Sequence, residues 1–322
     1  MNLLLKVNEL ETAFLTDQGE VTPVDGVNLE LMTGETLCIV GESGCGKSVT
    51  SMSIMRLLGK NGFIKSGSIQ FEDKDLVGLP ESQLRKIRGC DLAMIFQDPM
   101  TSLNPVFTIG NQLMESSRLH LKLSKKEAKD HAINMLKKVG IPRANEIMNA
   151  FPHELSGGMR QRVMIAIALS CKPKLLIADE PTTALDVTIQ AQILNLMKEL
   201  QKDTGTAIML ITHDLGVVAE MADRVVVMYA GQVVEESDVF TLFEKPLHPY
   251  TQGLMKSVPN ILVEADENLV SIPGTVPSLR NMPKGCRFSS RCEFATEKCK
   301  NNAPPLKNVG KGHKIRCWLV EE

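Results

Sequence analysis

The sequence predicts a mixed α/β protein whose core is a mostly parallel sheet, and three observations predict it. Apolar runs without polar alternation recur at residues 36–40, 92–96, 175–178, 207–211 and 224–229. Segments of helical character separate these runs, as expected for strands that are buried on both faces. A complete G-x-x-x-x-G-K-S loop follows the first run, and this motif requires a strand before it and a helix after it.

The beginning and the middle of the chain differ from this pattern. Residues 1–33 hold short alternating pieces that predict antiparallel strands, with a turn at 17–20. A helical segment at 49–58 follows the loop. From about 98 to 160 strand-like runs are absent, and amphipathic, charged segments predict a helical subdomain inserted in the α/β core.

The last part of the chain, residues 243–322, is rich in proline and predicts a small irregular extension. Because proline lacks an amide hydrogen and interrupts regular elements, we expect no regular sheet there. An extension this small also needs some form of cross-link to be ordered. The expected domains are therefore residues 1–242 and 243–322.

Composition excludes several classes of function. The 322 residues are 43% hydrophobic and carry a net charge of −2, so no global positive charge indicates a nucleic-acid partner. Only 4% are aromatic, which disfavours a surface for stacking bases. No stretch approaches the roughly 20 apolar residues that span a bilayer. The first nine residues turn polar too early for a secretion signal, so we expect a cytosolic protein or one held at a membrane by something else.

The loop at residues 41–48 is the strongest functional motif. Its glycines let backbone N–H groups converge on phosphate oxygens, Lys47 adds a positive charge, and Ser48 is placed to ligate Mg²⁺. A glycine-rich turn that only caps a helix is the alternative, and the surrounding strand and helix argue against it. The predicted nucleotide-binding residues are Gly41, Glu42, Ser43, Gly44, Cys45, Gly46, Lys47, Ser48 and Val49.

Carboxylates and an amide end two other expected strands. Asp179 and Glu180 follow the run 175–178, where one carboxylate can hold Mg²⁺ through water and the other can orient or deprotonate the attacking water. Gln97 closes the run 92–96 and can reach the metal ion or the water. Side chains of this kind also occur at ordinary solvated strand ends, but their combination with the loop favours catalysis.

A second candidate anion site lies just ahead of the strand at 175–178. Ser156, Gly157 and Gly158 stand at the expected start of a strongly apolar helix, with Gln161 in its first turn. Such a start offers a hydroxyl and free N–H groups to an anion. A helix cap without a ligand is the alternative, and it would be favoured if this segment stood alone.

Two single residues complete the set of candidates. His213 follows the run 207–211 at a strand end, where catalytic side chains gather in α/β sheets. Phe14 precedes the turn at 17–20 and can either stack on a base or pack in the core. Neither residue type is specific without the motifs around it.

Taken in order, these motifs resemble those of the ATP-binding cassette ATPases. Residues 41–48, Gln97, 155–161, 175–180, 184–186 and His213 match the Walker A, Q-loop, signature, Walker B, D-loop and H-loop motifs, and the likeness covers about residues 3–240. It implies a RecA-like P-loop NTPase core and ATP held between one subunit's Walker A loop and the other's signature. It further implies Glu180 as the catalytic carboxylate, His213 as the sensor of the γ-phosphate, Asp186 in the D-loop, and Mg²⁺ near Ser48, Gln97 and Asp179.

The resemblance continues into the extension. Residues 247–251, 272–277 and 285–292 resemble the C-terminal extension of oligopeptide and dipeptide importer ATPases, a subfamily shared by nickel and metallophore importers. This implies a protein at the cytoplasmic face of the membrane that couples ATP hydrolysis to peptide uptake, with metal-chelate uptake as the alternative. The implied partners are a paralogous ATPase subunit, two transmembrane permeases and an extracellular peptide-binding lipoprotein.

A soluble cassette ATPase that acts on DNA or ribosomes is the competing class of function. Proteins of that class typically carry a coiled coil, a second cassette or a basic arm. None of these is visible in the sequence, so a nucleic-acid partner is not expected.

Four cysteines, Cys286, Cys292, Cys299 and Cys317, cluster in the extension. Four thiolates suit either a [4Fe–4S] cluster or a tetrahedral Zn²⁺ ion. Zinc sites usually use closely spaced C-x2–4-C pairs, which are absent here. Because some members of the resembled subfamily carry an iron–sulfur cluster at similar cysteines, the cluster is the leading expectation, and zinc or unligated thiols remain open.

Overall fold

The computed structural model describes residues 2–98, 102–182, 186–257 and 272–320. Its fold is mixed α/β, as the sequence predicts. The chain divides into two compact units. The phosphate-loop unit comprises Leu5–Glu30, Thr36–Val77 and Ile211–Glu322, and the helical unit comprises Met1–Leu4, Leu31–Glu35 and Gly78–Leu210.

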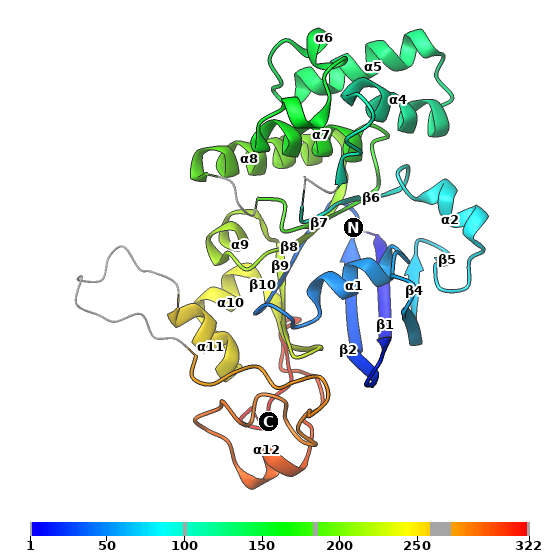
Figure 1. Cartoon of the computed structure of the whole chain (residues 1–322). Helices are drawn as coiled ribbons and strands as arrows, with labels where there is room; N and C mark the ends of the chain where they lie inside the picture. Colours follow the sequence, from blue (N-terminus) through cyan, green and yellow to red (C-terminus); the bar gives the residue numbers. More distant parts are fainter. Residues whose placement is uncertain (1, 99–101, 183–185, 258–271, 321–322) are drawn as a thin grey trace. The chain divides into compact units, whose positions relative to one another are not determined.

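The phosphate-loop unit carries an antiparallel sheet with the strand order β2-β1-β4-β5 (Figure 1). Its strands are β1 (Leu3–Thr16), β2 (Gly19–Met32), β4 (Gly62–Phe71) and β5 (Lys74–Asp75). The predicted antiparallel strands are therefore present, and β1 and β2 are longer than expected. β4 and β5 gave no sequence signal, because only two residues of β4 are buried and it carries polar residues along much of its length.

The strand that leads to the phosphate loop is buried along its whole length. In β3 (Thr36–Val40) every residue is buried, and β3 pairs in parallel with β9 (Arg224–Tyr229). β10 (Gln232–Asp238) returns antiparallel to β9. Helix α1 (Lys47–Ile54) begins at the last two residues of the loop, two residues earlier than predicted, and α9 (Leu215–Met221) follows the segment at 211–214.

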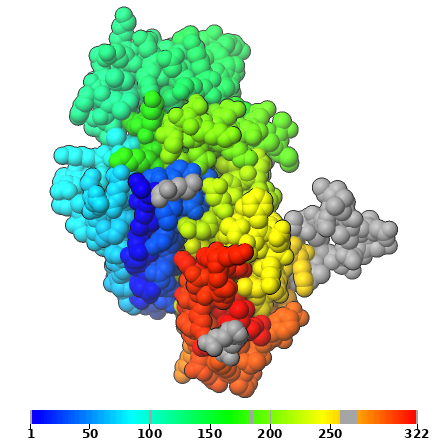
Figure 2. Space-filling model, turned by 180° about the vertical axis from the view of Figure 1, so that it is seen from behind, coloured from blue at the N-terminus to red at the C-terminus, as the bar shows by residue number. Residues whose placement is uncertain are grey.

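The extension corrects one expectation. It contains α11 (Pro249–Lys256) and α12 (Glu297–Asn301) after α10 (Val239–Glu244), and it also adds two short strands to the sheet. β12 (Lys314–Ile315) pairs antiparallel with β10, and β11 (Lys307–Asn308) pairs with β12. The sequence analysis expected no regular sheet there because of the prolines, but β11 and β12 lie beyond Pro305, contain no proline and join the edge of an existing sheet. Figure 2 shows the described end of the extension, in red, beside its earlier part, in orange.

The helical unit holds the strands β8 (Ala207–Ile211), β7 (Leu175–Asp179) and β6 (Leu92–Ile95) in this order, and β6 and β7 run parallel. Its helices confirm the helical character expected between 98 and 160, and α4, α5 and α7 pack on one another (Figure 1). They are α2 (Glu81–Ile87), α4 (Ile109–His120), α5 (Lys125–Lys138), α6 (Ala144–Ile147), the 3-10 turn Pro152–Glu154, α7 (Gly157–Leu169) and α8 (Val187–Thr204).

Local chemistry explains why the helices start where they do. Ser124 and Glu127 form a capping box at the start of α5, with each residue's side chain accepting a hydrogen bond from the other's backbone N–H. Thr108 caps α4 by accepting a hydrogen bond from Asn111 N at 3.3 Å. Within the described residues, no helix is both long enough and apolar enough to cross a membrane.

Candidate functional site

The phosphate loop adopts a backbone conformation that requires glycine at two positions. Gly41 and Gly46 have φ angles of +151° and +102°. A Cβ atom on Gly41 would lie 2.2 Å from the Met228 carbonyl oxygen, and one on Gly46 would lie 2.5 Å from the Pro23 carbonyl oxygen. No side chain caps α1 at Gly46, so the start of this helix is suited to receive an anion.

Lys47 lies inside the curve of this loop. The residue is 6% exposed, and its Nζ donates to the carbonyl oxygens of Gly41 at 2.7 Å and Glu42 at 3.1 Å. These two carbonyl groups hold the ammonium within the loop that would enclose the phosphates. An incoming phosphate group would therefore meet a positive charge that is already in position.

His213 shares a pocket with the loop. Thr212 N donates to Ile39 O at 3.2 Å, which places His213 just beyond the end of β3. The exposed His213 lines a pocket of about 350 Å³ together with Gly41 and Glu42. The structure therefore brings together the predicted histidine and the predicted loop, two motifs about 170 residues apart in the sequence.

Gln97 and Glu180 meet in the helical unit. The parallel pairing of β6 with β7 sets Ile95 opposite Ala178, and the two polar side chains each follow two residues later. Gln97 Nε2 donates to Glu180 Oε2 at 2.9 Å. Asp179, the last residue of β7, is 4% exposed, and Glu180 has a φ of +47°, which is uncommon for a residue with a side chain.

The segment at 156–158 presents an exposed helix start. Ser156 caps α7 by accepting a hydrogen bond from Met159 N at 3.4 Å, and Ser156 and Gly157 are exposed. A Cβ atom on Gly157 would meet nothing within 4 Å, whereas one on Gly158 would lie 3.2 Å from Ile189 Cγ2. The helix start is therefore open to a ligand at Gly157 and closely packed at Gly158.

Gln161 and Asp186 make contacts within their own unit. Gln161 is 2% exposed and donates from Nε2 to the Pro181 carbonyl oxygen. Asp186 caps α8 by accepting a hydrogen bond from Ile189 N at 3.0 Å. The remaining predicted D-loop residues, Ala184 and Leu185, lie outside the described residues.

Phe14 packs on a neighbouring strand. It lies in β1 opposite Gly62 of β4 and is half-buried. A Cβ atom on Gly62 would lie 2.7 Å from Phe14 Cε1, so the ring covers this glycine closely. Packing therefore accounts for the contact with Gly62, and stacking on a base stays a prediction.

Two residues of the extension contact the phosphate loop. Both lie in segments that carry the resemblance, at 247–251 and 285–292, but the sequence did not predict this contact. Glu42 N donates to Tyr250 Oη at 2.8 Å. Arg291 donates two hydrogen bonds to the Glu42 carboxylate, at 2.6 and 3.0 Å. A basic residue among many in the extension gave no signal of this partner, because the two residues are 249 positions apart.

The four cysteines of the extension line one small pocket, together with His248, Phe288 and Trp318. Burial raises the pKa of the Cys286 and Cys292 thiols above its usual range and raises the pKa of Cys317 to about 11. The donor set fits a cluster held by four thiolates. Among the residues that the structure describes, however, no three His, Cys, Asp or Glu side chains form a group that could hold a metal ion.

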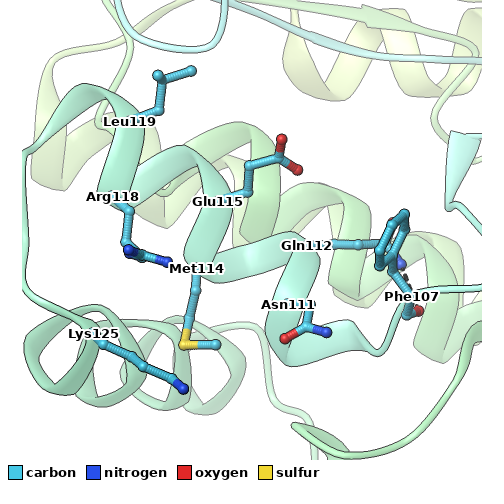
Figure 3. A pocket seen from close by; sticks show the side chains of 8 residues that line it. All are labelled: Phe107, Asn111, Gln112, Met114, Glu115, Arg118, Leu119 and Lys125. Carbon is cyan, nitrogen blue, oxygen red and sulfur yellow. Dashed lines mark hydrogen bonds between the residues drawn. The ribbon is translucent and has the colours of Figure 1, made fainter.

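A third pocket, of about 630 Å³, lies along α4 and the start of α5 (Figure 3). Exposed apolar side chains, Phe107 and Leu119, border it, and Val106 beside it is 72% exposed. Charged groups complete its lining: Glu115, Arg118 and Lys125. Exposed apolar surface rimmed by charges is typical of a contact surface for another protein.

Two family models match the chain. Residues 24–183 match the model described as ABC transporter. Residues 234–299 match the model described as oligopeptide/dipeptide transporter, C-terminal region. The second match covers most of the extension, including three of its four clustered cysteines.

Curated relatives match over almost the whole length. The oligopeptide transport ATP-binding protein AppD of Bacillus subtilis (strain 168) is 57% identical over 100% of this chain and 98% of its own. The oligopeptide transport ATP-binding protein OppD of the same organism is 54% identical over 98% and 89%. OppD of Haemophilus influenzae is 53% identical over 100% and 99%.

Solved structures match the cassette part. A post-hydrolysis state of the ATP-binding cassette MJ0796, a dimer bound to ADP and Pi, has a TM-score of 0.67 and 27% identity over 73% of this chain and 99% of that chain. A second dimeric structure of the MJ0796 cassette, a bacterial ABC transporter cassette, gives 0.67 and 28% over the same shares.

Proposed function

The chain belongs to the ABC transporter family of ATP-binding proteins, and on that premise we propose that it is the ATP-hydrolysing subunit of an importer for di- and oligopeptides. One observation carries the proposal: Lys47 stands inside a complete phosphate loop, on a chain that also has the peptide-transporter extension. The ATPase activity follows from the family, and the peptide cargo follows from the full-length relatives named for oligopeptide transport.

Each site residue has a proposed task. The residues from Gly41 to Val49 bind the phosphates of ATP, and Ser48, Asp179 and Gln97 surround Mg²⁺. Glu180 activates the attacking water, with Gln97 orienting its carboxylate through the 2.9 Å hydrogen bond. His213 contacts the γ-phosphate from the pocket that it shares with the loop. Phe14 stacks on the adenine base.

One half of an ATP site on this chain serves a second ATPase subunit. Its residues are Ser156, Gly157, Gly158 and Gln161, and Asp186 lies beside this half-site. The exposure of Ser156 and Gly157 supports this, because a helix start that is open to solvent can receive the phosphates of ATP bound to another subunit. The related MJ0796 cassette is a dimer bound to ADP and Pi. The second subunit of this importer is a paralogue of the chain.

The permease partners dock at the pocket that lies along α4 and the start of α5. Two transmembrane permeases carry the peptide, and an extracellular lipoprotein delivers it. Phe107, Leu119 and the charged rim of the 630 Å³ pocket offer apolar and ionic contacts to a permease segment on the cytoplasmic side (Figure 3).

We assign residues 1–242 to the cassette, with its helical subdomain at about 98–160, and 243–322 to the extension.

For the cysteine pocket we propose a [4Fe–4S] cluster held by Cys286, Cys292, Cys299 and Cys317. Four thiols that line one pocket support it, and a bound cluster would offset the burial that disfavours thiolates there. When bound, the cluster supplies a covalent link between distant parts of the extension. Anaerobic purification tests this: a brown protein that absorbs near 400 nm is expected, and a colourless protein containing zinc or no metal contradicts it.

Complementation of a deletion strain tests the function. A strain that lacks this chain should fail to grow on short peptides as its sole amino-acid source, and the wild-type chain should restore growth. Lys47→Ala is the matched control, because it removes one buried ammonium from the loop and should abolish rescue at equal protein level. Full growth of the deletion strain on peptides, together with loss of nickel uptake, would instead identify a metal-chelate importer.

A further inference from the structure

The guanidinium of Arg291 makes hydrogen bonds to backbone carbonyl groups and lies near two aromatic rings. Nε donates to Pro273 O at 2.9 Å, and Nη2 donates to Ile272 O at 3.2 Å. Its centre lies 5.7 Å from the ring centroid of Tyr229 and 5.9 Å from that of Phe288. The residue is only 8% exposed. A side chain fixed in this way cannot move without loss of several contacts at once, so it is suited to hold something else in place.

Arg291 forms an ion pair with Glu42, the second residue of the phosphate loop. Nη1 donates to Glu42 Oε2 at 2.6 Å and Nη2 donates to Glu42 Oε1 at 3.0 Å, a bidentate ion pair. Tyr250 Oη accepts the hydrogen bond from Glu42 N at 2.8 Å. The extension therefore fixes both the backbone N–H and the carboxylate of Glu42.

We infer that Arg291 is a positioning residue of the ATP site, which acts on the phosphate loop through Glu42. Two physical effects follow from the contacts. The loop's N–H groups bind phosphate only if the backbone is held in its curved form, and the Arg291–Glu42 pair restricts that backbone. The carboxylate of Glu42 also lies next to the binding place of a polyanion, and the positive charge of Arg291 compensates it.

Glu42 also affects the position of Lys47. The carbonyl oxygen of Glu42 accepts a hydrogen bond from Lys47 Nζ at 3.1 Å. A shift of Glu42 therefore moves one of the two acceptors that hold the ammonium. The extension is thus part of the nucleotide site, although its sequence contains no nucleotide-binding motif. This inference rests on the proposed function only in that the ligand is ATP.

The test measures ATP affinity in the full chain. We expect Arg291→Ala to weaken ATP binding about tenfold, and Arg291→Lys, which keeps the charge but not the two-pronged geometry, to weaken it less. Glu42→Ala removes the restraint on the loop but also the negative charge beside the phosphates, so it should weaken binding less than Arg291→Ala. Because the two residues act as a pair, the double variant should bind ATP about as well as Glu42→Ala alone. In the assembled transporter, Arg291→Ala should raise the KM for ATP and leave kcat within about threefold.

Arg316→Ala is the matched control. Arg316 also lies in the extension directly before a cysteine, but it donates to Val233 O and Pro304 O and makes no contact with the loop. The Arg316→Ala variant should keep its ATP affinity within twofold of wild type even if its melting temperature falls.

Three results would overturn the inference. They are an unchanged affinity in Arg291→Ala, an equal loss of affinity in Arg291→Ala and Arg316→Ala, and effects of Arg291→Ala and Glu42→Ala that multiply fully in the double variant. Each leaves the proposed function intact. A wild-type chain that binds no ATP, by contrast, overturns the proposed function itself and this inference with it.

Discussion

Gln97 donates a hydrogen bond from Nε2 to Glu180 Oε2 at 2.9 Å, across the ends of the parallel strands β6 and β7. The bond joins residues 83 positions apart, and it holds the Glu180 carboxylate in one orientation. Glu180 itself has a left-handed backbone, with a φ of +47°. An uncommon backbone conformation at a carboxylate that ends a core strand is typical of a functional site.

Glu180→Gln should abolish ATP turnover and keep ATP binding. The substitution preserves the size of the side chain and removes the negative charge that activates water, and losses of about 100-fold or more are typical for a general base. Turnover in the assembled complex and affinity for labelled ATP are the measurements. Turnover within tenfold of wild type would show that another group activates the water.

Gln97→Glu should shift the pH dependence of turnover. The substitution puts a second carboxylate where the Gln97 amide now contacts the Glu180 carboxylate, and two adjacent carboxylates resist ionising together. Activity that requires an ionised Glu180 should then be lost at a higher pH on acidification than in the wild type. Gln97→Ala is the control, because it removes the hydrogen bond without adding charge, and it should lower turnover without moving the acid limb as far. Identical pH profiles for all three proteins would contradict the proposed role.

Gly157→Arg should block hydrolysis in the assembled ATPase pair and leave ATP binding to the isolated chain unchanged. A Cβ on Gly157 meets nothing within 4 Å, so the side chain fits the fold and projects to where the other subunit's ATP would lie. Gly157→Ala is the conservative control and should keep most activity. Melting temperatures of both variants near wild type would confirm that the fold is intact, and full activity of Gly157→Arg would contradict the shared site.

Glu235→Ala should cost about 3–5 kcal/mol of unfolding free energy. Glu235 is fully buried and accepts hydrogen bonds from Leu247 N at 2.7 Å, His248 N at 3.0 Å and His313 Nε2 at 2.7 Å. Its removal leaves two buried donors and one part-buried donor without their acceptor, and each such loss is unfavourable.

Lys6→Ala provides the comparison for that measurement. Lys6 pairs with Glu30 at 2.7 Å, but both side chains are more than one-third exposed. An exposed pair contributes only about 0–1 kcal/mol. Urea unfolding of both variants should therefore separate them clearly, and a loss for Glu235→Ala as small as that for Lys6→Ala would contradict the role of Glu235.

Cys45 should resist alkylation although it lies in the phosphate loop. The residue is fully buried, and burial raises the pKa of its thiol above the usual range, so the reactive thiolate is scarce at neutral pH. Labelling with iodoacetamide at pH 7, followed by peptide mass spectrometry, should find Cys45 modified far more slowly than free cysteine, with the rate rising at alkaline pH. Rapid labelling at pH 7 would show that the loop opens often.

Much of the fold and the site could be predicted because their signals are local. Lys47 lies in a contiguous motif, and Gln97 and Glu180 each follow an apolar run, so the rule that catalytic groups gather at strand ends was enough to select them. Gln97 and Glu180 do meet, as the structure shows.

The remaining features depend on contacts that no local pattern records. Arg291 resembles any other basic residue of the extension until its partner is known. β12 has two residues and forms only because the edge of β10 is there to pair with it. The sequence analysis, which expected no regular sheet in the extension, did not predict these two short strands for that reason. Intrinsic propensity is weak evidence where an existing sheet edge offers hydrogen bonds.

The separation of Glu42 from Arg291 has a consequence for the newly made protein. A ribosome adds about 5–20 residues per second, so the 249 positions between them take roughly 12–50 s. Throughout that interval the nascent chain contains the residues of the phosphate loop, but the guanidinium that pairs with Glu42 has not yet been made. Maturation of the nucleotide site is thus a late event of synthesis, and a chain that terminates before residue 291 has the motif without the contact that fixes it.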